Sequence, residues 1–119
     1  MTKDELIQRT KVFAHNCIKL SLHLPKNALG KHVESQLIRS STSVAANYRA
    51  ACNAQSKPAF ISKISIVVEE ADESEFWLEL IQDEKLSDSE FVTLLKNEAF
   101  ELTSIFIAAR KTAQTNLKS

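Results

Sequence analysis

The residues Phe60-Ile-Ser-Lys-Ile-Ser-Ile-Val-Val-Glu-Glu-Ala-Asp-Glu-Ser-Glu-Phe-Trp-Leu-Glu-Leu-Ile81 decide the fold of this 119-residue chain. Apolar or small side chains recur there at alternating spacings of four and three residues, at Phe60, Ile64, Val67, Ala71, Ser74, Leu78 and Ile81. That spacing places them on one face of an α-helix, as in a helix that meets its bundle partners along a seam. Ser56 can cap this helix and Pro58 fits its first turn, so we expect a helix over residues about 57–84.

Three other segments show the same periodicity and have recognisable ends. Thr2 can cap a first helix while Glu5 reaches back to it, which is a capping box. Pro25 stops that helix, because proline lacks the backbone N–H. Ser87 and Glu90 have the spacing of a second capping box before the last helix. We therefore expect further helices over residues about 3–24, 28–53 and 88–114.

The composition agrees with a chain made almost wholly of helix. Its single glycine, Gly30, excludes phosphate-binding loops, which need two or more glycines, and disfavours all-β folds, which need many turns with positive φ. Four helices joined by short loops predict an all-α fold, an antiparallel up-down-up-down four-helix bundle, as a single domain over residues 1–119. Ile107 lies off the seam of the last helix, so we expect it to contact something outside the bundle.

Charge and hydropathy restrict the classes of function. Fifteen Lys and Arg balance fifteen Asp and Glu, which argues mildly against a monomer that binds nucleic acid through a global basic excess. The longest uncharged apolar run, residues 64–68, is far too short to span a membrane, and the charged N-terminus lacks the apolar segment of a signal peptide. Cys17 and Cys52 fall within apolar patterns, as buried reduced thiols do. We expect a cytoplasmic protein without membrane contact.

The third helix is unusually acidic. Eight carboxylates and no basic residue lie between Lys63 and Lys85, at Glu69, Glu70, Asp72, Glu73, Glu75, Glu79, Asp83 and Glu84. Carboxylates four residues apart repel each other in a helix, so groups outside this helix should compensate them. The second helix supplies Arg39 and Arg49 against the single acid Glu34. We therefore expect pairs between arginines and the carboxylates of this helix, within or between subunits.

A carboxylate-bridged metal site is the alternative use of these acids. Such a site needs inward-facing Glu-x-x-His pairs, and no glutamate here has a histidine three residues later. The small residues of the run Ser40-Ser-Thr-Ser-Val-Ala-Ala46 predict a tight helix crossing, and the local sequence offers no base for a catalytic serine. We therefore expect no metal, no cofactor and no catalytic residue, with a carboxylate-site metalloenzyme as a remote alternative.

A basic surface for nucleic acid has one candidate location, the connection between the first two helices. Lys26, Lys31 and His32 lie there, with Lys19 one turn before it. The segment from Lys63 to Glu84 is acidic by seven net charges, so the rest of this neutral chain is positive by seven. That polarity could orient subunits or form a basic face in an oligomer.

Two stretches resemble a known family. They are Gln36-Leu-Ile-Arg-Ser-Ser-Thr-Ser-Val-Ala-Ala-Asn-Tyr-Arg-Ala-Ala51 and Glu69-Glu-Ala-Asp-Glu-Ser-Glu-Phe-Trp-Leu-Glu-Leu80, with Phe60-Ile-Ser-Lys-Ile-Ser65 between them. They resemble the small bacterial four-helix-bundle family of 23S rRNA intervening-sequence proteins. The residues that carry the family pattern are Arg39, Asn47, Arg49, Glu70, Asp72, Glu73 and Trp77. The resemblance implies that they are bundle and interface determinants, in which Arg39 or Arg49 pairs with the region of Glu70, Asp72 and Glu73.

The resemblance implies a ring-like homopentamer. The chain is also similar to the accessory variability protein of diversity-generating retroelements, a basic pentameric barrel that binds nucleic acid and a reverse transcriptase. We therefore expect a non-enzymatic, homo-oligomeric binding or scaffold protein, with RNA or DNA as the preferred partner. The alternative is a protein-interaction adaptor for a nucleic-acid enzyme such as a reverse transcriptase.

Overall fold

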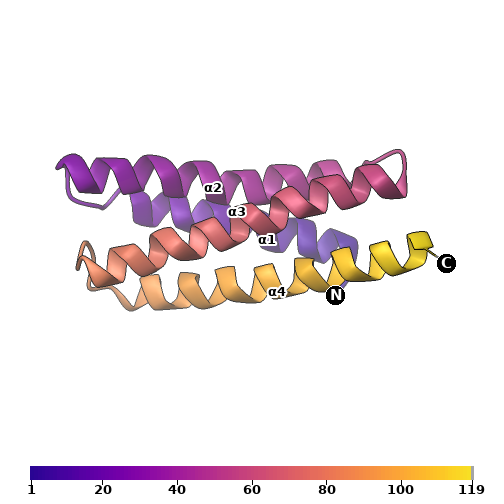
Figure 1. The fold of residues 1–119 in the computed structure, drawn as a ribbon. Coiled ribbons are helices and arrows are strands. Elements are labelled where there is room, and N and C mark those ends of the chain that lie inside the picture. The colour runs from indigo at the N-terminus through magenta and orange to yellow at the C-terminus, as the bar shows by residue number, and fades with distance from the viewer. Residues whose placement is uncertain (119) are drawn as a thin grey trace.

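The computed structural model describes residues 1–118 and shows four helices without strands among them. The helices are α1 (Lys3–Ser21), α2 (Ala28–Cys52), α3 (Lys57–Asp83) and α4 (Glu90–Lys118). Each packs against the next along the chain, and α1 also contacts α4, so the four helices enclose one core (Figure 1). The predicted all-α four-helix bundle is confirmed, with dimensions of 51 × 21 × 20 Å.

The helix ends differ from the expected bounds by a few residues. α1 ends at Ser21 instead of residue 24, because Leu22 to Leu24 already turn towards α2. α2 and α3 each end one residue earlier than expected, and α4 continues to Lys118. The start of α4 corrects a specific prediction. The Ser89 hydroxyl, instead of that of Ser87, accepts the backbone N–H at the start of the helix, from Phe91 at 3.1 Å.

The other helix starts use side-chain caps. The expected capping box is present on α1, where the Glu5 N–H donates to Thr2 Oγ1 at 3.1 Å and the Thr2 N–H to Glu5 Oε1 at 3.4 Å. Ser56 caps α3 through the Ala59 N–H, as expected. These side chains satisfy backbone N–H groups that have no partner within the helix.

The core is formed by the seams of the four helices. Phe13, Leu37, Ile64 and Phe106, one from each helix, are fully buried. Small polar side chains allow α2 and α3 to approach closely: the hydroxyl oxygens of Ser40 and Ser74 lie 2.9 Å apart, and both residues are completely buried. A core of this kind holds the outer faces of the helices in fixed positions relative to one another.

The loop between α1 and α2 folds back onto the first turn of α2. Asn27 caps this helix by accepting the Gly30 N–H at 2.8 Å. A Cβ atom at Gly30 would overlap the carbonyl oxygen of Pro25. The only glycine of the chain therefore stands where a loop backbone lies directly against a helix.

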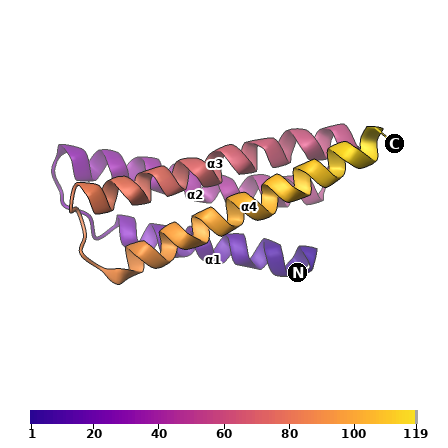
Figure 2. The same ribbon diagram turned by 60° about the horizontal axis from the view of Figure 1, so that its bottom comes forward.

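The contact between α1 and α4 is the least extensive of the four interhelical contacts. Figure 2 shows why: α4 crosses α1 obliquely, and its C-terminal turns extend past the beginning of α1. Within residues 1–118, no helix is both long enough and apolar enough to cross a lipid bilayer.

Candidate functional site

An ion-pair network joins α2 to α3. Arg39 Nη1 lies 2.7 Å from Glu70 Oε2, and Arg39 Nη2 contacts Glu73 Oε2. The same Glu73 oxygen accepts the indole N–H of Trp77 at 3.0 Å. The hydrogen bond to Glu73, followed by that to Glu70, raises the pKa of Arg39 above its ordinary value. Two of the repelling carboxylates of α3 thus share one guanidinium from α2.

Arg49 and Asp72 lie outside this network. Both side chains are exposed, and neither forms an ion pair with any residue in the described range 1–118. The helical period explains the position of Arg49. It follows Arg39 by ten residues, or about 2.8 turns, so it lies about 80° short of three full turns and faces α1 instead of α3. Of the five residues expected to pair, the structure therefore brings three together: Arg39, Glu70 and Glu73.

A second interhelical pair joins α1 to α4 and was not anticipated from the sequence. Arg9 Nε and Nη2 lie 2.7 and 2.6 Å from the two carboxylate oxygens of Glu98, and Nη2 is also 3.7 Å from Glu101 Oε2. The hydrogen bond to Glu98 raises the pKa of Arg9. Because the partners are 89 residues apart, no local pattern connects them. The available signal was that Glu98 and Glu101 are one turn apart on the same side of α4.

The remaining acids of α3 are crowded. The pKa of Glu75 is raised first by partial burial and then by the negative charges of Asp72 and Glu79, while Lys96 of α4 opposes the shift. Asp72 and Glu79 themselves are exposed. The outer side of α3 therefore keeps a negative potential that the bundle does not neutralise.

The four residues expected to contact nucleic acid lie at one end of the bundle but differ in their surroundings. Lys26 Nζ is 3.1 Å from Glu34 Oε2, so its charge is partly compensated. The His32 ring packs edge-on against Trp77, with ring centroids 5.5 Å apart. Lys19 and Lys31 are exposed and form no ion pair within residues 1–118.

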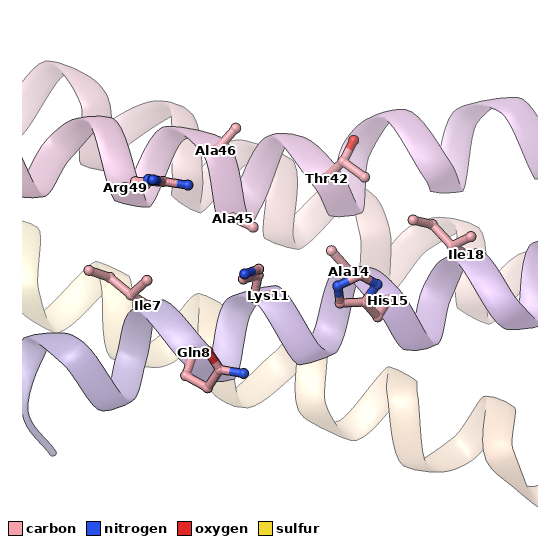
Figure 3. A pocket seen from close by; sticks show the side chains of 10 residues that line it. All are labelled: Ile7, Gln8, Lys11, Ala14, His15, Ile18, Thr42, Ala45, Ala46 and Arg49. Carbon is pink, nitrogen blue, oxygen red and sulfur yellow. The ribbon is translucent and has the colours of Figure 1, made fainter.

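A groove of about 540 Å³ runs between α1 and α2, on the face turned away from the other two helices (Figure 3). Its floor is apolar and built largely from small side chains, and its polar lining includes cations. We name this surface the α1–α2 groove; the lining residues are Ile7, Gln8, Lys11, Ala14, His15, Ile18, Thr42, Ala45, Ala46 and Arg49. The sequence periodicity did not reveal it, because alanines on an outer face look like ordinary helix formers.

Large apolar side chains are exposed on the opposite pair of helices. Phe76 of α3 is 54% exposed, and Phe100 and Ile107 of α4 are 60% and 44% exposed. Ile107 thus projects outside the core, as its position off the seam of α4 predicts. Exposed aromatic side chains of this size are typical of interaction surfaces.

The two cysteines are free thiols in different surroundings. Cys17 is buried, which raises the pKa of its thiol to about 12 and keeps it protonated, and Cys52 is a half-buried free thiol. Among residues 1–118, no three His, Cys, Asp or Glu side chains are grouped so as to hold a metal ion.

Comparison with known proteins identifies the family. A sequence model described as "23S rRNA-intervening sequence protein" matches residues 2–108, which is most of the chain. The chain belongs to this family. No curated protein matches it significantly.

A solved relative supports the assignment. This intervening-sequence family member is 31% identical to a protein from Bacteroides thetaiotaomicron VPI-5482, whose crystal structure is described as that of a protein with unknown function from the S23 ribosomal protein family. The likeness covers 88% of this chain and 97% of the other, with a TM-score of 0.81. Neither description names an enzymatic activity.

Proposed function

We propose that this 23S rRNA intervening-sequence family member is a non-enzymatic scaffold that assembles with copies of itself and binds nucleic acid. One observation carries the proposal: charge is divided between the two halves of the bundle. Residues 1–56, which contain α1 and α2, hold eight Lys and Arg against three Asp and Glu, whereas residues 57–119 hold seven against twelve. The chain is neutral overall because the net positive charge of the first half balances the net negative charge of the second.

Self-assembly is supported by the surfaces that the fold leaves uncovered. One pair of helices carries an apolar groove, and the other pair carries exposed phenylalanines. Association of copies would remove both surfaces from water, which is favourable. The resemblance of the sequence to pentameric proteins makes a homopentamer the proposed assembly. A ring would also repeat the same basic residues several times, which increases the avidity for a polyanion.

Nucleic acid is proposed to contact the end of the bundle where α1 leads into α2. Lys19 and Lys31 are exposed there and form no ion pair within residues 1–118, and Lys26 and His32 lie at the same end of the bundle. The chain carries no loop rich in glycine, so a polymer that lies across helix surfaces fits better than a small phosphate ligand.

The test is fluorescence anisotropy with labelled single-stranded and double-stranded RNA and DNA, at about 50 mM and about 200 mM salt. We expect binding that weakens steeply with salt, since phosphate contacts release counterions. The double variant Lys19→Glu/Lys31→Glu should lose affinity, and its salt dependence should be shallower by about one unit per lysine in each bound subunit. The matched control Lys57→Glu/Lys63→Glu, which changes two exposed lysines of α3, should retain binding. Absence of binding by the unmodified protein at low salt would reject the nucleic-acid role.

The second candidate function is a protein-interaction adaptor for a nucleic-acid enzyme such as a reverse transcriptase. The apolar floor of the α1–α2 groove favours it, because apolar grooves lined by small side chains suit protein partners. The adaptor would be favoured over direct nucleic-acid binding by a stoichiometric protein partner that remains bound after nuclease treatment. The substitution Ala46→Trp, which fills the groove, should abolish binding of that partner.

A further inference from the structure

We infer that the α1–α2 groove receives the outer face of α3 and α4 from a second copy of this chain. This inference rests on the proposed self-assembly and specifies the two surfaces that meet. We name the second surface the acidic–aromatic ridge; its residues are Glu69, Asp72, Phe76 and Glu79 of α3 and Phe100 and Ile107 of α4.

The ridge is one continuous surface because of helical spacing. Its α3 residues are exposed and follow one another at intervals of three, four and three, so they form a single stripe. Phe100 and Ile107 are seven residues apart and share a stripe on α4.

Contacts of Gln82 fix the register between the two antiparallel helices: its side chain lies 2.8 Å from Thr93 Oγ1 and 3.2 Å from Lys96 Nζ. Phe76 precedes Gln82 by six residues and Phe100 follows this part of α4 by a similar number. The two phenylalanines therefore lie at about the same level of the bundle.

The groove is complementary to the ridge in shape and polarity. Ala14, Ala45 and Ala46 leave room between α1 and α2 for large side chains, and Ile7 and Ile18 mark the two ends of the apolar lining. Along α1 these ends are about 16 Å apart, close to the roughly 15 Å between the first and last acids of the ridge. The aromatic side chains of the ridge would fill the space that the alanines leave.

The groove is also complementary to the ridge in charge. Lys11 and Arg49 border it and form no ion pair in the described part of the chain. Of the three acids of the first two helices, Glu5 belongs to the capping box, Glu34 pairs with Lys26, and the exposed Asp4 lies in the first turn of α1, outside the groove lining. The exposed Asp72 and Glu79 likewise form no ion pair within residues 1–118. The cations of one copy and the carboxylates of the next can therefore neutralise each other.

The positions of the two surfaces determine the type of assembly. Around the bundle, α1 and α2 form one side and α3 and α4 form the opposite side (Figures 1 and 2). Contact between unlike surfaces on opposite sides is heterologous, which adds copies in one direction and closes into a ring if the rotation permits. A contact of like surfaces would instead bring the acids of two ridges together.

The test uses two variants that each destroy one surface. Ala46→Trp places a bulky side chain in the groove at an exposed position, and Phe76→Ser/Phe100→Ser removes the aromatic side chains of the ridge. Light scattering after size exclusion measures their mass, and circular dichroism and thermal melting verify that each is folded. We expect each variant alone to have the mass of a single chain, where the unmodified protein is larger.

Mixing provides the decisive measurement. The groove variant keeps its ridge and the ridge variant keeps its groove, so an equimolar mixture should give a one-to-one heterodimer that does not grow further. As matched controls, Leu94→Ser removes an exposed apolar side chain of α4 outside the ridge, and Val12→Trp enlarges an exposed side chain of α1 outside the groove. Both controls should keep the mass of the unmodified protein.

The outcomes separate this inference from the proposed function. A monomeric unmodified protein at micromolar concentrations would reject self-assembly itself. If the unmodified protein assembles but the groove and ridge variants keep the same mass, the inference is overturned and self-assembly is retained. The groove would then be available to an acidic helix of another protein. Two monomeric variants that fail to pair on mixing would also overturn it, since each surface would then contact something other than its counterpart.

Discussion

Gly30 illustrates how one residue can matter through its missing side chain. Glycine normally weakens a helix by about 1 kcal/mol relative to alanine. Here it stands in the first turns of α2, where the Pro25 carbonyl oxygen occupies the place of a Cβ atom. Glycine is therefore required here because the preceding loop packs against this position. The helical pattern of α2 gives no sign of that contact.

Gly30→Ala tests this explanation. Helix propensity alone predicts stabilisation by about 1 kcal/mol, whereas displacing the Pro25 carbonyl should cost more, so we expect net destabilisation of about 1–2 kcal/mol. Urea denaturation measures the difference. Ser35→Ala, at an exposed position of the same helix, is the control and should stay within about 0.5 kcal/mol of the unmodified protein. An alanine variant more stable than the unmodified protein would contradict the proposed role of the loop.

The arginines show how far residue-level prediction reaches. Arg39 could be expected to pair with the acids of α3, because carboxylates that repel one another need a cation from outside their helix, and the structure places it there. Arg49 could not be assigned in the same way. Arg49 lies ten residues after Arg39 and therefore on another side of α2, and only the packing of the helices decides whether that side meets α1 or α3.

At the scale of the elements, two ion-pair clusters hold the helices together at different levels of exposure. The Arg39 side chain is 49% exposed and its partners Glu70 and Glu73 are 14% and 33% exposed, whereas Arg9 and Glu98 are 25% and 26% exposed. Arg9 also binds both oxygens of one carboxylate, a geometry that gives stronger hydrogen bonds. α1 and α4 share the least extensive contact in the bundle. This ion pair therefore contributes a larger fraction of the free energy that holds these two helices together.

We therefore expect Arg9→Ala to destabilise the fold more than Arg39→Ala. The loss should be about 1–2 kcal/mol for Arg9, whose hydrogen bonds to a carboxylate are partly buried, and at most about 1 kcal/mol for the more exposed Arg39. Urea denaturation of both variants, with Lys63→Ala as an exposed control, measures the order. A larger loss for Arg39→Ala would contradict the expected order of the two ion pairs.

The ends of the elements were less predictable than their existence. The Thr2 and Ser56 caps follow directly from the sequence, because each is the only suitable residue next to an apolar seam. Before α4 two serines compete, and Ser89 caps the helix instead of Ser87. α3 ends at Asp83, and two residues later Lys85 adopts a φ of 54°, a left-handed conformation that no glycine in the sequence signals.

At the scale of the whole molecule, the neutral composition divides into a positive pair of helices and a negative pair. Such a molecule has complementary outer surfaces, and assembly would neutralise them while covering the exposed phenylalanines. Assembly would also link stability to concentration, since a partner that binds only the folded state stabilises it.

We expect the melting temperature of the unmodified protein to rise over a hundredfold increase in protein concentration. Differential scanning calorimetry measures it, and the groove variant Ala46→Trp is the matched control, with a melting temperature independent of concentration. Added salt should reduce the rise, because the proposed contact pairs exposed charges. A melting temperature of the unmodified protein that does not change with concentration would speak against assembly in this range.

The sequence by itself determined the four helices, the antiparallel bundle and the family. Each depends on local spacing, on caps and on motifs that can be read along one segment. Only the tertiary structure decided that Arg9 binds Glu98, that Gly30 lies against Pro25, and that alanines of α1 and α2 form a groove. These features require the rotation of each helix about its axis, which is set by how all four seams pack into one core at the same time.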